Sequence, residues 1–426
     1  MTLNVQSQPQ QVVRPAFKFV LLSSLYTSQF LPSAFFFQAL PIFLRQQGAS
    51  LGVIGLLGLL TLPWMLKFLW APLVDRYGSR RWGHYKSWIV ATQGLLALTL
   101  LACASINVVD NARLLFQGVF LVVTLAATQD IATDALAVRL LAPHERGWGN
   151  GIQSAGRAMG GILGGGVMLL TLNQLGWQSS VWILAAGVVL ALLPLFWYRE
   201  PKRLAVEAEV SRSNGVAQAI ARYLETLVSF LRQSDALIWL FFILLYVTGS
   251  SMAATMFRPL LVDLGLSMAD IGWMTGIVGS GAAIVGSLLA GGLIQPLGRQ
   301  RALVLFGVIQ AIAVVALTLP AMGVRDPLVL YGVSTGEVFA RSLANTALFT
   351  IMMDKSRPAT AGSDYTLQSS VFIIGHHVGV PALSGFIATA LGYTSVFLMG
   401  FVICLASVWL ATKVIREPNY KPGLEH

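Results

Sequence analysis

Residues 114–141, LLFQGVFLVVTLAATQDIATDALAVRLL, decide how this chain is organised. The segment is longer than the roughly 20 apolar residues that a helix needs to cross a bilayer, so it predicts a transmembrane span. Its second half nevertheless carries two carboxylates, Asp130 and Asp134. They lie four residues apart, about one helical turn, and therefore share a helix face. Because charge inside a span is costly and normally faces a bundle interior, the segment predicts several spans around a polar centre.

Composition places the whole chain in a lipid bilayer. Of its 426 residues, 56% are hydrophobic and 11% are charged, against about 25% charged in a soluble domain. The mean hydropathy is +0.72, and the apolar residues come in long blocks, which predicts an all-α membrane protein. We expect twelve transmembrane helices, at about 17–43, 51–73, 87–106, 114–138, 149–172, 179–198, 236–257, 269–293, 302–320, 328–352, 366–390 and 395–414.

The longest polar stretch divides these spans into six and six. We therefore expect an N-terminal half over 1–198, a linker over 199–235 and a C-terminal half over 236–426. Of the 28 Lys and Arg residues, 21 fall on the side of the termini and the linker, and four fall on the other side. The positive-inside rule then predicts that both termini and the linker are cytoplasmic.

Several function classes are excluded or disfavoured. The formal charge of +10 would suggest a nucleic-acid partner in a soluble protein, but beside membrane spans it sets topology, so no nucleic acid is expected. Cys103 and Cys404 each lie in an apolar segment and are interpreted as buried small side chains. The polar start of the chain, 1–14, predicts no cleaved signal peptide. The sequence has no phosphate loop, serine elbow or His-Glu-x-x-His motif, so neither an enzyme nor a cofactor is expected.

An internal repeat relates the two halves. APLVDRYGSRR at 71–81 and GGLIQPLGRQR at 291–301 have the same spacing at an offset of 220 residues. A second match, at an offset of 215, aligns Gln153 and Ser154 with Gln368 and Ser369. Duplicated halves are typical of secondary transporters, in which the substrate site lies between the repeats.

The first of these loops resembles the signature of the major facilitator superfamily, Gly-x-x-x-Asp-Arg/Lys-x-Gly-x-Arg/Lys-Arg/Lys. Ala71 stands for the opening glycine, and Gln295 replaces the acid in the second copy. KFLWAPLVDR at 67–76 and QDIATD at 129–134 are similar to the muropeptide permease (AmpG-like) branch. More narrowly, ATQDIATDALAVR at 127–139 resembles single-component siderophore importers of the rhizobactin, pyochelin and yersiniabactin permease type. The resemblance implies two pseudo-symmetric six-helix halves, a monomer, and a cavity lined by spans 1, 4, 5, 7, 10 and 11.

The two carboxylates of span four are candidates for proton coupling. A carboxylate in a cavity of low dielectric constant can load and release a proton. The alternative is a structural ion pair with Arg157 on span five or Lys67 on span two. We expect Asp130, the deeper residue, to reach the cavity with Arg157 as its partner, and Asp134 to lie nearer the cytoplasmic end. Asp130 aligns at the 215 offset with Asn345, which cannot titrate.

Two further pairs of polar residues lie in the second half. Glu337 and Arg341 are four apart on span ten, in the order that favours an intrahelical pair; a role of Glu337 in coupling requires that pair to exchange partners. His376 and His377 are adjacent on span eleven, so they point about 100° apart. A metal site would prefer a spacing of three or four, and none is expected. One of them could face the cavity, His376 for proton transfer or His377 for a substrate contact.

The substrate contacts are expected mainly on span one and span five. Gln29, Ser33 and Phe36 or Phe37 follow helical spacing and could form one cavity face; alternatively, the Phe run faces lipid. An amide beside aromatic rings suits a large, aromatic and partly polar ligand. Arg157, four residues after Gln153, could attract an anion. The full set of candidate contacts is Gln29, Ser33, Phe36, Gln38, Gln129, Gln153, Arg157, Arg341, Asn345 and His377.

The charged loop after span two is interpreted as a gate. Asp75, Arg76, Arg80 and Arg81 can pair with neighbouring helix ends in one conformation and release them in another. Together with the resemblance, these features predict a transporter of the bacterial inner membrane that works by alternating access with the proton gradient as driving force. Import of a ferric siderophore is the most specific hypothesis. The alternatives are a permease for muropeptides or another bulky solute, and a membrane sensor that binds such a ligand without moving it.

Overall fold

The computed structural model describes residues 14–46, 57–79, 81–106, 111–201, 225, 228–233, 235–377 and 380–414. These residues are almost entirely helical, with one isolated β-bridge between Ser79 and Gly83, so the predicted all-α fold is confirmed. Most of the expected linker, 202–224, lies outside the described residues, as does Arg80.

The N-terminal half consists of α1 (Pro15–Ala34), η1 (Phe35–Ala39), α2 (Leu40–Gln46), η2 (Leu57–Thr61), α4 (Leu62–Leu66), η3 (Lys67–Leu69), α5 (Ala71–Arg76), α6 (His84–Ala104), α7 (Ala112–Leu140), η4 (Pro143–Glu145), α8 (Arg146–Gly161), η5 (Ile162–Val167), α9 (Met168–Leu190) and α10 (Leu193–Trp197). The C-terminal half consists of α13 (Ala236–Asp263), α14 (Met268–Ile271), η6 (Gly272–Val278), α15 (Gly279–Leu297), α16 (Arg299–Ala316), α17 (Thr318–Ala321), α18 (Pro327–Lys355), η7 (Pro358–Thr360), α19 (Ala361–His377) and α20 (Val380–Val414).

Eight helical stretches of the described chain are long and apolar enough to cross a membrane. One of them, 143–197, contains two predicted spans, because the chain reverses at Gly176 with φ 74°. Only glycine adopts that left-handed conformation without steric cost. The predicted second, tenth and eleventh spans are not among the eight. The second is broken into η2, α4, η3 and α5, while α18 and α19 are rich in polar residues.

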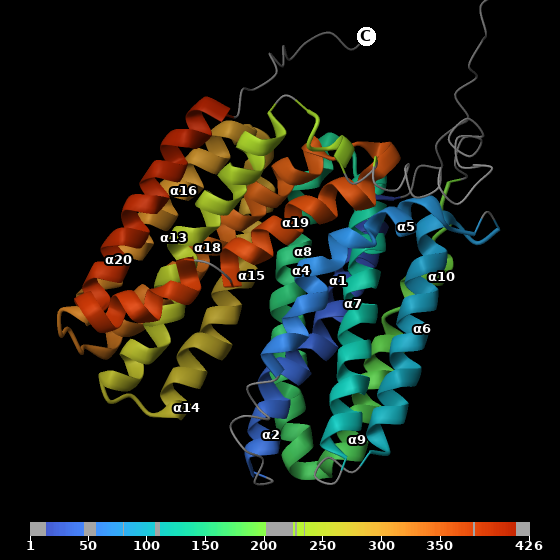
Figure 1. The fold of residues 1–426 in the computed structure, drawn as a ribbon, viewed down its shortest axis with the longest axis horizontal. Coiled ribbons are helices and arrows are strands. Elements are labelled where there is room, and N and C mark those ends of the chain that lie inside the picture. The colour runs from blue at the N-terminus through green and yellow to red at the C-terminus, as the bar shows by residue number, and fades with distance from the viewer. Residues whose placement is uncertain are drawn as a thin grey trace, which may run out of the picture.

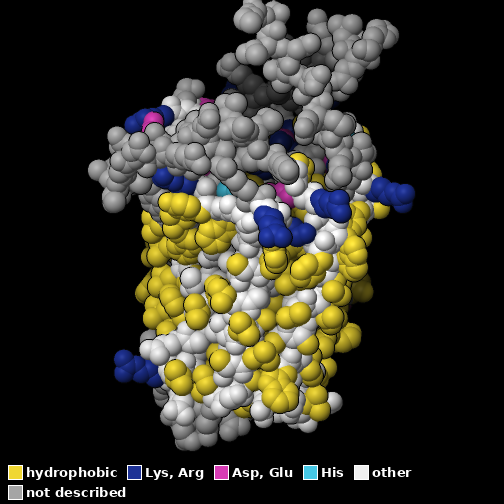
Figure 2. Space-filling model, turned by 90° about the vertical axis from the view of Figure 1, so that its right-hand side faces the viewer, with side chains coloured by type: hydrophobic (Ala, Val, Ile, Leu, Met, Phe, Trp, Pro, Cys, Tyr) yellow, Lys and Arg dark blue, Asp and Glu magenta, His cyan; other side chains and the backbone are white. Residues whose placement is uncertain are grey.

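The two halves lie side by side, α1 to α10 at the right and α13 to α20 at the left of Figure 1. They pack against each other through α8 with α15 and α18, and through α19 with α5 and α7. Their lower ends, which carry α2 and α14, lie apart in that view. Figure 2 shows a flank that is largely hydrophobic, with most basic side chains gathered toward the upper end.

Glycines let α8 and α15 approach at backbone distance. A Cβ atom built on Gly151 would lie 2.7 Å from the carbonyl oxygen of Ser287, and one on Gly147 would lie 2.8 Å from that of Gly291. Small residues at such crossings permit close helix contact. The contact therefore joins the two halves at the end of the molecule where α8 begins.

Phe35 and Phe36 of the first span are buried, so the alternative that the Phe run faces lipid is wrong for these two residues. Both side chains are fully buried in the core of the N-terminal half. The reason is the π-helical turn η1, which adds a residue to one turn and changes which side chains face inward.

Candidate functional site

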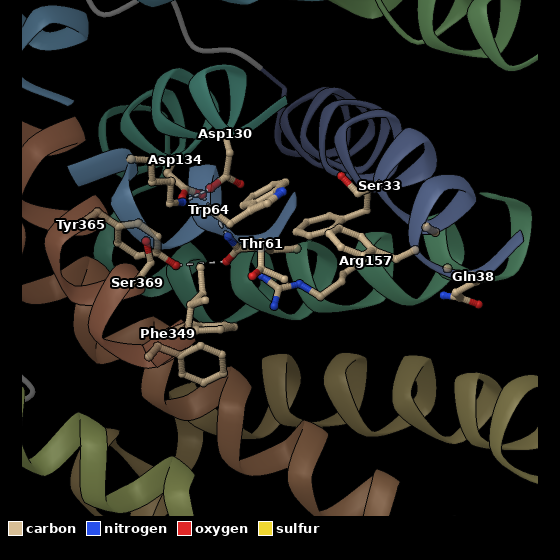
Figure 3. Close-up of a pocket in the computed structure, with 18 residues that line it drawn as sticks. Ser33, Gln38, Thr61, Trp64, Asp130, Asp134, Arg157, Phe349, Tyr365 and Ser369 are labelled. Atoms are coloured by element: carbon tan, nitrogen blue, oxygen red, sulfur yellow. Dashed lines mark hydrogen bonds and ion pairs between the residues drawn. The ribbon is translucent and has the colours of Figure 1, made fainter. Parts of the chain in front are cut away.

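A cavity of about 260 Å³ lies between the two halves (Figure 3). Its lining comes from the first, second, fourth, fifth, tenth and eleventh spans, so the expectation of span seven is wrong for this cavity and span two takes its place. The lining residues are Phe30, Ser33, Ala34, Phe37, Gln38, Thr61, Trp64, Lys67, Asp130, Asp134, Gln153, Arg157, Gly161, Phe349, Tyr365, Ser369, Phe372 and Ile373.

Asp130 is paired with Lys67, and both side chains are almost completely buried. Gln29 adds a third contact, because its Nε2 donates to Asp130 Oδ1 at 2.5 Å. Lys67 reaches this position because the second span breaks into the 3-10 turn η3 at this residue. The prediction that Arg157 is the partner of Asp130 is wrong, and its stated alternative, Lys67, is confirmed.

Asp134 lines the same cavity, so the prediction that only Asp130 reaches it is wrong. Asp134 lies one helical turn after Asp130, so the two side chains share a face of α7. The hydroxyl of Tyr26 and the amide Nε2 of Gln153 each donate to Asp134 Oδ1 at 2.9 Å. Tyr365 extends the network by donating to Gln153 Oε1 at 3.1 Å. Among the described residues, no cation lies within ion-pair distance of this carboxyl.

Arg157 projects from α8 into the cavity between aromatic rings (Figure 3). Its guanidinium carbon lies 4.5 Å from the ring centre of Phe30 and 5.6 Å from that of Phe349. These rings belong to opposite halves, and each can attract a cation through its π face. The buried Nε of Arg157 has no hydrogen-bond partner among the described residues. The side chain therefore presents unused donors beside the cavity.

The internal repeat gives the cavity two chemically different walls. At the 215 offset, Asp134 corresponds to Phe349 and Arg157 to Phe372, and all four line the cavity. The N-terminal half thus places charged groups where the C-terminal half places aromatic rings. Such an arrangement suits a ligand with an ionic part and an apolar or flat part.

Three of the predicted contacts of the N-terminal half lie away from the cavity. Gln29 is buried against Asp130, Phe36 lies in the core, and Gln129 donates to Gln93 Oε1 at 3.0 Å. Ser33 and Gln38 line the cavity as expected, and Phe37 replaces Phe36. Hydropathy gives the length of a span, but it does not give its rotation, which packing and η1 determine here.

Of the candidates of the C-terminal half whose side chains are described, none lines this cavity. Glu337 and Arg341 form the expected intrahelical pair, 2.8 Å between Oε1 and Nε. Asn345 is half-buried one turn further along α18. His376 Nδ1 shares a hydrogen bond of 2.7 Å with the Ser251 hydroxyl, and the side chain of His377 lies outside the described residues.

The predicted gate residue Asp75 connects the two halves. Its carboxylate accepts hydrogen bonds from the backbone N–H of Gly362 at 2.9 Å and of Ser363 at 2.7 Å, and from the Ser363 hydroxyl at 2.6 Å. Tyr85 donates a further bond of 2.8 Å from within its own half. Burial raises the pKa of the Asp75 carboxyl, while the bonds from Ser363, Tyr85 and Gly362 act in the opposite direction.

Other charged groups at the same end also cross between the halves. Asp354 accepts from Arg146 of the other half and from Arg299 of its own half, each at 2.8 Å. Arg139 donates across the halves to the carbonyl of Pro358. Arg76 lies over the ring of Tyr77, and the side chain of Arg81 is exposed. The gating role of these residues stays a prediction. Across the described residues, no group of three His, Cys, Asp or Glu could hold a metal ion.

Several lining residues were not predicted from the sequence. They are Phe30, Thr61, Trp64, Phe349, Tyr365, Ser369 and Phe372. A usable signal existed for two of them, since Phe349 and Phe372 align at the 215 offset with the candidates Asp134 and Arg157. The repeat gives no such signal for Trp64. Its ring stacks on that of Phe30, with ring centres 5.3 Å apart.

Comparison with known proteins agrees with this fold. The profile of the Major Facilitator Superfamily matches residues 22–380. The chain is 26% identical over 373 residues to the anhydromuropeptide permease of Escherichia coli, covering 86% of this chain and 74% of that one. It is 24% identical over 384 residues to a Rickettsia bellii protein named putative transporter AmpG 1, covering 87% and 92%. The crystal structure of the transporter FucP in the outward conformation superposes with a TM-score of 0.67 at 16% identity, covering 94% and 99%.

Proposed function

The chain belongs to the Major Facilitator Superfamily and resembles its AmpG-like branch, and from this premise we propose that it imports a bulky solute of the muropeptide class. Transport runs from the periplasm to the cytoplasm across the bacterial inner membrane, by alternating access between the two halves. The proton gradient is the driving force. The observation that carries the proposal is a cavity between the halves that combines charged groups of the N-terminal half with aromatic rings from both halves.

The chemistry of a muropeptide fits these walls. Such a molecule combines flat-faced sugar rings with a peptide that ends in carboxylates. Aromatic side chains bind sugar and other apolar faces, while a few placed polar groups fix orientation. The cavity offers Phe30, Trp64 and Phe349 for the first role and Arg157 for the second. Relatives over most of the chain are named for anhydromuropeptide and AmpG transport, which favours this solute over the siderophore hypothesis.

A ferric siderophore remains the second candidate because of one observation. Among the described residues, six aromatic side chains line the cavity: Phe30, Phe37, Trp64, Phe349, Tyr365 and Phe372. A siderophore with phenolate or catecholate rings would stack on such surfaces. In that case the iron is cargo, held by the siderophore and not by the protein.

Uptake into proteoliposomes tests both candidates. Radiolabelled anhydromuropeptide and a labelled ferric phenolate siderophore are supplied outside, with and without an imposed pH gradient. We expect accumulation of the anhydromuropeptide when the lumen is alkaline. Accumulation of the siderophore alone would make it the cargo, and equal uptake without the gradient would contradict proton coupling. Binding without accumulation of either probe would indicate a sensor.

The matched variants are Asp134→Asn and Asp326→Asn. Asp326 caps α18 at the other end of the molecule by accepting from the backbone N–H of Leu328 at 2.8 Å. Asparagine is an equally good N-cap, so this variant should transport normally. Asp134→Asn should lose gradient-driven uptake, because the amide cannot titrate. Full gradient-driven uptake in that variant would contradict a role of Asp134 in proton coupling.

A further inference from the structure

Four charged side chains line the central cavity: Lys67, Asp130, Asp134 and Arg157. Lys67 and Asp130 form an ion pair and so neutralise each other. Asp134 and Arg157 remain, and they contact different neutral groups. Asp134 accepts from Tyr26 and Gln153, whereas Arg157 lies between two phenyl rings.

We propose that Arg157 is the receptor for a carboxylate of the cargo and that Asp134 carries the proton that accompanies this anion. The proposal rests on the transport function above and names the chemical group that the same site selects. It also assigns separate roles to the two acids of α7, with Asp130 as the fixed partner of Lys67 and Asp134 as the group that changes its protonation.

The setting of Arg157 fits an anion receptor. A guanidinium held between ring faces keeps its N–H donors in its own plane, where a planar carboxylate can accept two of them. The buried Nε has no partner among the described residues, and an unsatisfied buried donor costs free energy. A bound carboxylate would remove that cost. Because Phe30 and Phe349 come from opposite halves, the bound anion would lie where the halves meet.

The setting of Asp134 fits the proton carrier. The charged and titratable groups that face it are Asp130 from α7, Lys67 from η3, Arg157 from α8, Tyr26 from α1 and Tyr365 from α19. A buried carboxylate with neutral donors alone lacks the compensation that an ion pair gives. Accepting a proton removes its charge without breaking a salt bridge, whereas protonating Asp130 would leave Lys67 unpaired.

The charges of the cavity link the two events. With Asp134 ionised, the four lining charges sum to zero, and an incoming carboxylate would bring an uncompensated negative charge into a region of low dielectric constant. With Asp134 protonated, the sum is positive by one charge, and the carboxylate neutralises it. Cargo anion and proton therefore favour each other's binding, and this linkage is reciprocal.

Binding measurements on the purified full chain test the anion receptor. Trp64 stacks on Phe30 beside Arg157, so its fluorescence reports on the cavity, with Trp64→Phe as the blank. The probes are benzoate and its neutral analogue benzamide, which assume nothing about the cargo. We expect benzoate to bind at least tenfold more tightly than benzamide. Arg157→Gln should abolish the difference, and Arg157→Lys should retain part of it. An unchanged preference in Arg157→Gln would overturn the proposal.

Proton uptake on binding tests the role of Asp134. In weakly buffered solution, the wild type should take up close to one proton per bound benzoate, and benzamide should cause none. Asp134→Asn should bind benzoate without proton uptake and with affinity independent of pH. Proton uptake that persists in Asp134→Asn would overturn this assignment.

The same assay with anhydromuropeptide separates this inference from the proposed function. If the preference for benzoate over benzamide depends on Arg157 but anhydromuropeptide does not bind, Arg157 is an anion receptor and the muropeptide class is not the cargo. Binding of anhydromuropeptide that is equal in wild type and Arg157→Gln, and equal after amidation of its carboxylates, would support the cargo and refute the receptor. Thermal unfolding of each variant shows whether a loss of binding results from misfolding. If Arg157→Gln is misfolded, Arg157→Lys is compared with the wild type in its place.

Discussion

Lys67 on η3 and Asp130 on α7 form an ion pair in which neither side chain is more than 4% exposed. The pair connects the broken second span to the fourth span within the N-terminal half. Two charges buried together are much less costly than either charge alone, because each desolvated ion needs the field of the other. The pair thus fixes the local geometry of the cavity and leaves Asp134 and Arg157 as its unpaired charges.

Removing one partner of this pair should be far more damaging than removing both. We expect Lys67→Met and Asp130→Asn to lower the free energy of unfolding by about 3–5 kcal/mol each, since each leaves a buried polar group without its partner. The double variant should recover a large part of that loss. Reversible denaturant unfolding in detergent measures the coupling as a double-mutant cycle.

Lys355 and Asp235 provide the control for that cycle. They also form a Lys–Asp ion pair, with Nζ and Oδ2 2.9 Å apart, but their side chains are 28% and 51% exposed. A pair in contact with water contributes about 0–1 kcal/mol. A coupling energy for Lys67 and Asp130 no larger than that of this surface pair would contradict the structural role assigned to the buried one.

Asp75→Asn should shift the conformational equilibrium toward separation of the halves at the end where α5 and α19 meet. The aspartate accepts three hydrogen bonds from Gly362 and Ser363 across the interface. Hydrogen bonds to a charged group contribute about 1.5–3 kcal/mol each, so losing part of this set should change the population ratio at least tenfold. Spin labels at His144→Cys and Ala359→Cys, with Cys103 and Cys404 replaced, measure the distance between the halves.

Arg81→Gln is the control for this measurement, because the Arg81 side chain is exposed at the same end of the molecule. It should leave the distance distribution unchanged. A distribution in Asp75→Asn identical to that of the wild type would show that the α8 and α15 contact closes this end without the carboxylate.

Gly164→Ala should destabilise the N-terminal half, whereas Gly166→Ala should not. Both glycines lie in η5. A Cβ atom on Gly164 would overlap the backbone carbonyl of Leu31, while one on Gly166 would meet no atom within 4 Å. Overpacking against backbone costs about 1–3 kcal/mol, and replacing an unconstrained helical glycine by alanine is neutral or stabilises by up to about 1 kcal/mol. Thermal unfolding in detergent compares the two variants, and equal midpoints would contradict the predicted α1 and η5 contact.

The sequence predicted the spans and the polar segment of α7 because both depend on local composition. A run of apolar residues is visible at any rotation of the helix, and Asp130 and Asp134 differ from everything around them. The pair Glu337 and Arg341 was also predictable, since both members lie on one helix at a fixed spacing.

The partners of these residues could not be predicted in the same way. Whether Lys67 or Arg157 reaches Asp130 depends on the break at η3 and on the rotation of α8, and neither leaves a signal in hydropathy. The aromatic lining residues Phe349 and Phe372 were not predicted, because a phenylalanine in a span has the same hydropathy whether it faces lipid, core or cavity. The 215-residue repeat held a signal for two of these residues, because Phe349 and Phe372 align with the charged residues Asp134 and Arg157.

Stability should depend on pH through Glu145, which precedes the predicted fifth span, 149–172. Partial burial raises its pKa, but the hydrogen bond and charge of Lys18 and the backbone N–H of Ala142 lower it more, so the pKa lies below its usual value. A carboxyl whose pKa is depressed by folding stabilises the fold above its unfolded pKa, about 4.3, and loses that contribution as pH falls through the folded pKa.

Glu145→Gln should therefore unfold at a lower temperature than the wild type at pH 7, and the difference should shrink as the pH falls below about 4.3. Lys18→Met should reduce the same pH dependence, because it removes the cation that Glu145 binds at 2.8 Å. Midpoints measured in detergent from pH 7 to pH 3 give both comparisons. The difference in unfolding midpoint between wild type and Glu145→Gln could instead be constant over this range. Since packing does not titrate, that outcome would show that the carboxylate acts through packing. The ion pair between α1 and the start of α8 would then contribute nothing to stability.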